Sequence, residues 1–430
     1  MSRPGNMVFS QFNGLARTLY HRAPPGLHWV LSPLAFCFRV LRQLRLDFWI
    51  VQGEELSSRT SLSILCATND RNRSYIAGLA FGANYCEQYL GRAWLWNANI
   101  MTEKTGRGYS MMLVEIHTSL RRLLGTSNWF YVPDWVRGTI DFPLKPTITN
   151  CESVKSDLRR IRKNDLGFEV TRETQRFDDF YHNMYVPYTV RAHGSSAKIT
   201  PYELMRNQFK NGELLLVTKQ QKHIAGILIR YSKAGPCLSS LGIWHGNWKY
   251  VRYGAAGALY YFSLRYLEDK GFSKVDCGLS RAFLRDGVLR YKKKWGQRIV
   301  GMSSNMFALK VLSYTAATRA FLVNNPFIFE YRGSSNGAVF VDTEKLLLPQ
   351  ELERIDKDYF YPGLSKLFVY LLQRNHTPKP NVVPPELSAR IVLRSAEDRD
   401  KGAGNHHAEQ RENRSFTETT GPECRDVCRR

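Results

Sequence analysis

The first 46 residues contain no acidic residue, and the whole chain is short of acidic residues. Against 61 lysines and arginines it has 38 aspartates and glutamates, so its net charge is +23. This excess indicates anionic partners such as nucleotides, acidic glycans, lipid headgroups or nucleic acid. No RNA- or DNA-binding signature, zinc-finger spacing or basic-region zipper occurs, so nucleic acid is the least favoured of these partners.

Long apolar runs are also missing. A membrane-spanning helix needs about 20 apolar residues, and the nearest candidate, residues 27–41, is interrupted by His28, Pro33 and Arg39. The acid-free start carries six arginines, which favours a flexible or membrane-touching N-terminal arm over an import signal. We therefore expect a cytoplasmic protein, and peripheral attachment to the inner membrane stays open.

Eight cysteines are scattered without the spacing of a disulfide framework, which suits a reducing compartment. Cys424 and Cys428 have no second pair nearby, so we expect no metal site. No convincing Ser-His-Asp or Cys-His motif is present either, and Cys277 follows Asp276 in a predicted strand as a core residue would.

Composition and hydrophobic pattern divide the chain into five parts. They are a basic N-terminal arm (1–46), a first folded region (47–150), a second folded region (151–305), a helical extension (306–375) and a disordered tail (376–430). In the second region the pattern predicts two helices, three strands, a helix, a strand, a loop and a further strand. This order indicates a mixed sheet flanked by helices, an α/β (α+β) fold.

Elements outside that region are predicted from the same periodicities. Strands are expected at residues 62–66, 74–81 and 92–100, and helices at residues 110–124, 306–323 and 359–373.

The stretch of residues 271–296 carries the most information. Gly271 marks the end of a helix, residues 272–277 alternate as a strand does, and Asp286-Gly287 is a turn signal. Residues 288–295 alternate apolar and basic and then become lysine-rich, which predicts a second strand with a row of cations. Such cations can hold a phosphate or stabilise an oxyanion. The alternative is a solvated basic edge strand.

Three segments together resemble a known family. The matching positions are Phe180-Tyr181 through His193-Gly194, Gly271-Phe272 through Asp276 and Gly278, and Asp286-Gly287, Tyr291-Lys292 and Trp295-Gly296. In this order they resemble the GNAT-like acetyltransferases of the bacterial polysaccharide-associated (cellulose-biosynthesis) type, which are related to the FemAB peptidyltransferases. The resemblance covers roughly residues 155–300.

The resemblance implies a GNAT fold in which an acyl-CoA donor, acetyl-CoA in the first place, enters a split between two strands. It leaves open a duplicated arrangement, with residues 47–150 as a degenerate second GNAT-like half. Its donor pyrophosphate would meet the start of the helix at Gly254, Ala255 and Gly257, where small side chains and the helix dipole favour an anion. Close packing of helix and sheet is the alternative reading of these small residues. Arg252 with Ala255 and Gly257 only approximates the family's phosphate signature, so a different donor stays open.

The resemblance also implies roles for individual side chains. Lys292 would lie beside the reacting carbonyl and stabilise the oxyanion. The assigned residues are Lys292, Asp286 and His193 for catalysis, Lys249, Arg252, Gly254, Ala255 and Gly257 for the donor, and Arg191, Tyr291 and Arg290 for the acceptor. Asp286 would orient its loop or accept a proton, and a capping role is the alternative for His193.

The predicted function is therefore transfer of an acyl group, acetyl in the first place, from a CoA thioester to an amine or hydroxyl. The acceptor would be sugar- or lipid-linked, as in polysaccharide or envelope biosynthesis. One alternative is a FemAB-like aminoacyl transferase that uses aminoacyl-tRNA. Another is a non-catalytic GNAT-fold scaffold whose basic surface docks on an anionic membrane or a glycan.

Overall fold

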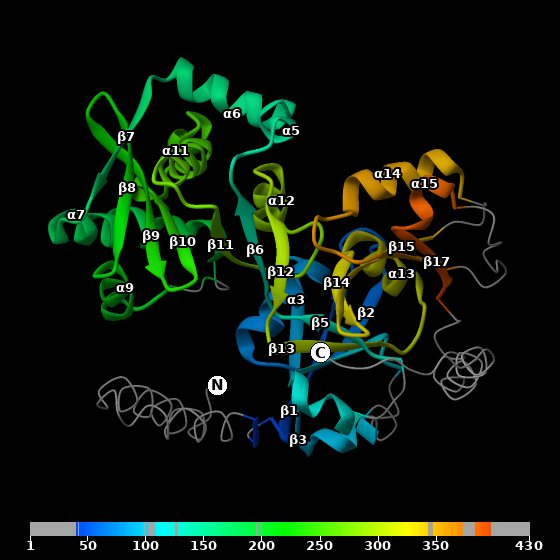
Figure 1. The fold of residues 1–430 in the computed structure, drawn as a ribbon. Coiled ribbons are helices and arrows are strands. Elements are labelled where there is room, and N and C mark those ends of the chain that lie inside the picture. The colour runs from blue at the N-terminus through cyan, green and yellow to red at the C-terminus, as the bar shows by residue number, and fades with distance from the viewer. Residues whose placement is uncertain are drawn as a thin grey trace, which may run out of the picture.

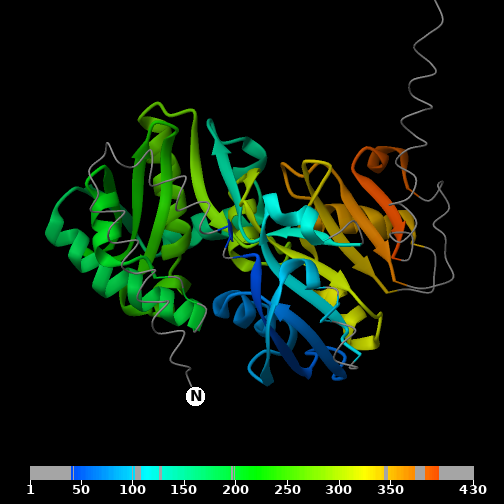
Figure 2. The same ribbon diagram turned by 90° about the horizontal axis from the view of Figure 1, so that it is seen from below.

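The computed structural model describes residues 40–396 except 42, 99, 102–107, 125–127, 195–196, 198, 343–346 and 373–382. The N-terminal arm up to residue 39 and the tail from residue 397 lie outside the described residues. Within them the chain is a mixed α/β protein with two sheets, of ten and of seven strands. Figures 1 and 2 show the seven-stranded sheet, mostly green, beside the ten-stranded sheet, mostly blue, yellow and orange.

The ten-stranded sheet has the order β17-β16-β15-β14-β5-β13-β4-β2-β1-β3. Its strands are β1 (Arg45–Glu54), β2 (Ser61–Ala67), β3 (Tyr85–Trp94), β4 (Met111–His117), β5 (Phe130–Pro133), β13 (Asn305–Val311), β14 (Phe327–Tyr331), β15 (Ser334–Val341), β16 (Leu367–Leu371) and β17 (Ile391–Ser395).

Helices and helical turns accompany this sheet. They are α3 (Asp70–Phe81), η2 (Leu95–Asn97), η3 (Thr118–Leu124), α13 (Ala316–Asn324), α14 (Pro349–Tyr359) and α15 (Pro385–Ser388).

The seven-stranded sheet has the order β12-β6-β11-β10-β9-β8-β7. Its strands are β6 (Val136–Asp141), β7 (Leu166–Thr171), β8 (Gly212–Lys219), β9 (Lys222–Ser232), β10 (Gly235–Ile243), β11 (Lys274–Ser280) and β12 (Arg298–Met302). Its helices and helical turns are α5 (Pro146–Thr149), α6 (Glu152–Lys163), α7 (Thr174–Asp179), η4 (Phe180–Tyr185), α8 (Val186–His193), α9 (Tyr202–Phe209), η6 (Trp244–Gly246), α10 (Trp248–Arg252), α11 (Ala255–Asp269) and α12 (Gly287–Lys294).

Both faces of the strands β8 and β9, next to the edge strand β7, are buried. Leu215 and Val217 of β8 pack with α11, whereas Leu214 and Leu216 pack with η4 and α9. Successive side chains of a strand point to opposite faces, so a continuous apolar run in β8 supplies two cores. The helices on either face then hold this sheet between two layers.

Two segments pass from one sheet into the other and pair along the way. Only Asp134 and Trp135 separate β5 in the first sheet from β6 in the second, and Ser303 and Ser304 separate β12 from β13. The Trp135 amide donates to Ser303 Oγ at 3.0 Å, and the Ser303 amide donates to the Trp135 carbonyl at 2.8 Å. The two sheets are therefore joined by a paired two-stranded crossing.

The two halves repeat one strand order. Reading β1-β2-β4-β13-β5 in one sheet and β9-β10-β11-β6-β12 in the other gives an antiparallel hairpin, a parallel neighbour, and two further antiparallel strands. In each half the fourth strand, β13 or β6, enters through the crossing from the other half. The strand order is thus duplicated in the two sheets, and the halves exchange strands.

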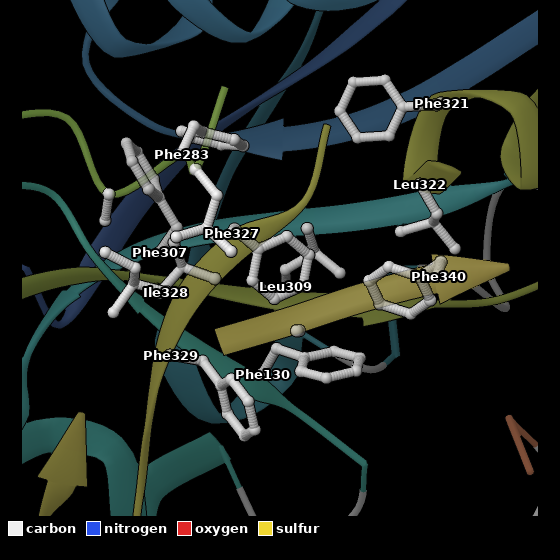
Figure 3. Close-up of a cluster of buried hydrophobic side chains, with 14 of the residues drawn as sticks. Phe130, Phe283, Phe307, Leu309, Phe321, Leu322, Phe327, Ile328, Phe329 and Phe340 are labelled. Carbon is white, nitrogen blue, oxygen red and sulfur yellow. The ribbon is translucent and has the colours of Figure 1, made fainter. Parts of the chain in front are cut away.

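The core of the first half includes residues from the second. Phe283 and its neighbours, between β11 and α12, lie among Phe130, Phe307 and Phe327 (Figure 3). The Leu284 amide donates to the Pro326 carbonyl at 2.8 Å. The loop that leads into α12 is thus anchored in the other half.

Several sequence predictions are wrong. Residues 74–81 fall within α3, and most of residues 111–117 and 306–311 are strand where helix was expected. Residues 367–371 are β16, so the helical extension over residues 306–375 is instead a mixed segment that completes the first sheet. The expected disorder from residue 376 is wrong for α15 and β17.

The prediction of a strand for the lysine-rich segment is also wrong, because residues 287–294 form the helix α12. The Asp286 side chain caps it by accepting from the Leu289 amide at 2.8 Å. Leu289 and Lys292 are its buried residues, three positions apart on one helical face. The short alternation of apolar and basic residues therefore did not reflect burial.

Glu213 at the start of β8 ties four side chains together. It accepts from Arg172 (2.7 Å), Tyr231 (2.7 Å), Tyr266 (2.7 Å) and Lys270 (3.0 Å). Burial alone would raise the pKa of Glu213, but these hydrogen bonds outweigh it and lower that pKa to about 2.

The folded-state pKa of Glu213 is below its ordinary value of 4.5, so its stabilising effect is present above pH 4.5 and is lost as the pH falls toward 2. Glu213→Gln should lower the free energy of unfolding by roughly 2 kcal/mol at pH 7. Urea denaturation of both proteins between pH 2 and 7 checks this, and the difference should shrink below pH 4.5. A difference that is constant across this range would contradict the assignment.

Candidate functional site

The parallel strands β10 and β11 are paired over a very short stretch. They pair at one position, Cys237 with Asp276, and each then continues without the other. Gly278 has a left-handed φ of 70°, and a Cβ there would lie 3.2 Å from the Leu238 carbonyl of β10. A glycine is therefore needed where β11 turns away. The resemblance implies a split between two strands, and we call the carboxyl end of this strand pair, beyond its one paired position, the split.

Lys292 lies at the end of β11, beside this split. Its side chain is 5% exposed, and its Nζ donates to the Leu279 carbonyl at 2.9 Å and to Ser280 Oγ at 3.0 Å. Burial lowers the pKa of Lys292 below the ordinary lysine value. An ammonium has three N–H donors, and these two bonds engage two of them.

The neighbours of Lys292 on α12 have other surroundings. Asp286 caps the helix by accepting from the Leu289 amide. Tyr291 points its hydroxyl at Asp157 Oδ2 of α6, 3.3 Å away, and packs on Tyr260. Burial, followed by the charge of Asp157, raises the pKa of Tyr291. Arg290 is exposed.

The small residues at the start of α11 lie under α6. Gly254 and Ala255 are buried, and a Cβ added at Gly254 would lie 2.9 Å from Arg160 Cβ. A Cβ added at Gly257 would lie 2.8 Å from the Asp157 side chain. Asp157 in turn accepts from Lys294 at 2.5 Å. Close packing of α6 on α11 therefore explains why these side chains are small.

Exposed cations border the start of α11. Lys249 and Arg252 of α10 are both exposed, and Lys249 Nζ lies 5.7 Å from the centroid of the Tyr253 ring. Lys219, at the turn between β8 and β9, lies 5.4 Å from the same ring and donates to the Asn164 carbonyl at 2.9 Å. Sequence reasoning missed Lys219, because only the fold brings that turn to α10.

Two predicted acceptor-side residues end the helix α8. Arg191 is exposed and His193 is its last residue. The side chain of His193 lies outside the described part of the structure. Within the described residues no hydrogen bond, ion pair or ring contact joins Arg191 to Lys292.

Sequence reasoning also missed Arg281, which directly follows Ser280. Its buried guanidinium pairs with Asp134, donates to Asn72 Oδ1 at 2.9 Å, and lies 4.3 Å and 4.2 Å from the ring centroids of Tyr75 and Trp135. These partners come from the first half and from the crossing. Arg281 thus fixes the end of β11 that Lys292 contacts.

Other site types find no support among the described residues. They hold no cluster of three or more His, Cys, Asp or Glu side chains suited to a metal ion. A polar hollow of about 420 Å³ lies on α7, lined by Glu173, Gln175, Arg176 and Asp179, and includes none of the predicted site residues.

No protein-family model matches the chain, and no curated protein matches it. Solved structures with some likeness include the C-terminal domain (DUF2156) of a putative lysylphosphatidylglycerol synthetase from Agrobacterium fabrum, at 12% identity over 64% of this chain and 84% of that chain, with a TM-score of 0.31. A GCN5-related N-acetyltransferase from Sphaerobacter thermophilus has 12% identity, 59% and 74% coverage and a TM-score of 0.28. FemX has 10% identity, 60% and 83% coverage and a TM-score of 0.29. Likenesses this distant assign no activity.

The packing of α6 on α11 can be tested directly. Gly257→Ala should lower the free energy of unfolding by roughly 1–3 kcal/mol, because the new methyl group would collide with Asp157. Gly78→Ala, within α3, is the matched control, since a Cβ there meets nothing within 4 Å. That control should stabilise by roughly 0.5–1 kcal/mol. Equal effects of the two substitutions in urea denaturation would contradict the packing.

Proposed function

We propose that the chain is an acyltransferase that moves an acyl group from a CoA thioester to an amine or hydroxyl group. The acyl end of the donor would enter the split between β10 and β11. The observation that carries this proposal is a buried lysine, Lys292, bonded to the end of the strand that borders the split.

In the proposed reaction the acceptor nitrogen or oxygen adds to the thioester carbonyl. The remaining N–H of the Lys292 ammonium donates to the oxygen on which negative charge develops. A donor held in place within a site poor in water stabilises such charge strongly. The C–S bond then breaks, and the acceptor proton leaves with CoA as its thiol. His193 is the proposed relay for that proton.

The donor phosphates would bind outside the split, where Lys219, Lys249 and Arg252 line one region of the surface. Charge-assisted bonds from exposed lysines and arginines suit a pyrophosphate. The buried residues Gly254, Ala255 and Gly257 at the start of α11 would shape the donor site more than they would contact the donor directly. The net charge of +23 favours an acceptor with phosphate or carboxylate groups, such as a sugar- or lipid-linked one, with Arg191, Arg290 and Tyr291 proposed at its side.

A second candidate donor is an aminoacyl ester of tRNA. The face of α6 presents the exposed cations Lys155, Arg159, Arg162 and Lys163. A row of cations along a helix fits a phosphate backbone. Calorimetry with acetyl-CoA, a longer acyl-CoA and tRNA separates the two donors. CoA binding without tight tRNA binding supports the first candidate, and the reverse result supports the second.

Lys292→Met keeps the volume of the side chain and removes the ammonium. We expect kcat to fall by a factor of about 10² to 10³ while donor affinity stays within about threefold, because the lysine acts on the developing charge. Steady-state kinetics and calorimetry measure the two quantities. A variant with full turnover would show that Lys292 only holds β11.

The pH profile gives a second readout. Since burial lowers the pKa of Lys292, wild-type turnover should decline with rising pH below the ordinary lysine value of about 10.4. Lys292→Arg retains the charge, so its residual activity should lack this alkaline decline. An identical decline in both proteins would assign it to another group.

A further inference from the structure

Two tryptophans at the end of β3 are stacked on the protein surface. The ring centroids of Trp94 and Trp96 lie 4.9 Å apart, with an interplanar angle of 9°. They are 43% and 49% exposed, although Leu95 between them is fully buried. The Leu95 amide also donates to the Leu44 carbonyl at 2.8 Å. The pair is therefore held rigidly outward by a buried anchor.

More exposed apolar side chains lie at the same end of the first sheet. Leu41 is 61% exposed and precedes Leu44 by one turn, and Ile100 follows Trp96 by four residues and is 41% exposed. Leu123 of η3 is also 41% exposed, and η3 packs with η2 in one core. Figure 1 shows the cyan helical turns of this region beside β1 and β3. We call Leu41, Trp94, Trp96, Ile100 and Leu123 the tryptophan face.

Two arginines lie near the tryptophan face. The guanidinium of Arg45 lies 5.8 Å from the Trp94 ring centroid, and Arg122 of η3 is exposed. The nearby Asp47 is paired with Arg92 at 2.8 Å, so its charge is compensated. The sequence before Asp47 has six arginines, Arg45 among them, and no acidic residue. An anionic partner is therefore favoured at this face.

We propose that the tryptophan face docks on the surface of a bilayer that contains anionic lipids. Tryptophan rings favour the level of the lipid headgroups, where one part of the ring is apolar and the N–H is hydrated. Arginine beside them is attracted to an anionic leaflet. Within the described residues no helix has the length and apolarity needed to cross a bilayer. The proposed attachment places a rigid apolar face at the interface.

This proposal is independent of the acyl-transfer proposal, because none of the five residues belongs to the site around Lys292. Vesicle binding tests the face, and turnover on a water-soluble acceptor tests the chemistry. A protein that binds vesicles without turnover would fail only the second, and a protein with turnover that ignores vesicles would fail only the first.

The test is co-sedimentation of the full chain with vesicles of phosphatidylcholine alone and of phosphatidylcholine mixed with phosphatidylglycerol. The wild type should bind the anionic vesicles and bind neutral ones weakly. Trp94→Ala with Trp96→Ala should lower the anionic partition coefficient by about tenfold or more. Trp248→Ala is the matched control, since Trp248 is 41% exposed on α10, in the other half. That control should bind as the wild type does.

Tryptophan emission gives a direct signature. Anionic vesicles should shift the emission of the wild type to shorter wavelength, and the double variant should lose most of that shift while retaining its circular dichroism. Equal vesicle binding by the double variant and the control would overturn the proposal. So would loss of a dimer in the double variant during gel filtration, since the face would then join two copies of the chain.

Discussion

The buried ion pair of Arg281 and Asp134 lies where the two halves meet, and the rest of the structure depends on it. Asp134 stands at the step where the chain passes from β5 to β6, and Arg281 directly follows β11. The guanidinium is enclosed by the rings of Tyr75 and Trp135. Breaking such a buried pair by removing one partner costs about 3–5 kcal/mol. The pair therefore fixes the crossing strands and the end of β11 together.

The exchange of strands makes neither half complete alone. Each sheet has a strand that arrives from the other half, and Phe283 of the second half lies in the core of the first. The loop and helix that carry Lys292 are consequently held from both sides. The hydroxyl of Tyr361, which lies between α14 and β16 of the first half, donates to the Leu289 carbonyl of α12 at 3.0 Å. Such double anchoring suits a side chain that must keep its position during a reaction.

A comparison of the two halves also explains why only the second half is proposed to be active. In the first half β2 and β4 pair at four consecutive positions, from Ile64 with Met111 to Ala67 with Val114. Their counterparts β10 and β11 pair at one. The connection η3, equivalent to α12, has Leu120 and Leu124 as its buried residues and no buried cation. The first half thus has a closed strand pair and the second an open one.

Much of the second half was predictable because its strands and helices have clear periods. The helix α9, the strands β8 to β10, the helix α11 and the strand β11 match the predicted order. The segments at residues 111–117 and 306–311 were predicted as helix because strands buried on both faces are largely apolar and show no clear period of two. The helix α12 was predicted as a strand because its buried face includes a lysine, which a polarity pattern counts as exposed.

The residues of the candidate site also differ in whether the sequence alone could identify them. Lys292 and the helix-capping Asp286 could be named from local motifs, since the residues that define them are adjacent in sequence. Lys219 and Arg281 could not, because their partners Tyr253 and Asp134 are fixed only by long-range pairing. The exchange of β6 and β13 is likewise invisible locally, since each strand pairs with strands far away in the sequence.

The central claim is that an acyl donor enters the open strand pair of the second half. Hydrogen–deuterium exchange with and without a non-reactive thioether analogue of acetyl-CoA tests it most directly. The account predicts new protection in residues 237–243 and 278–281, with no change in residues 61–67 and 111–117 of the closed pair. Protection confined to the closed pair, or absent from both, would contradict it.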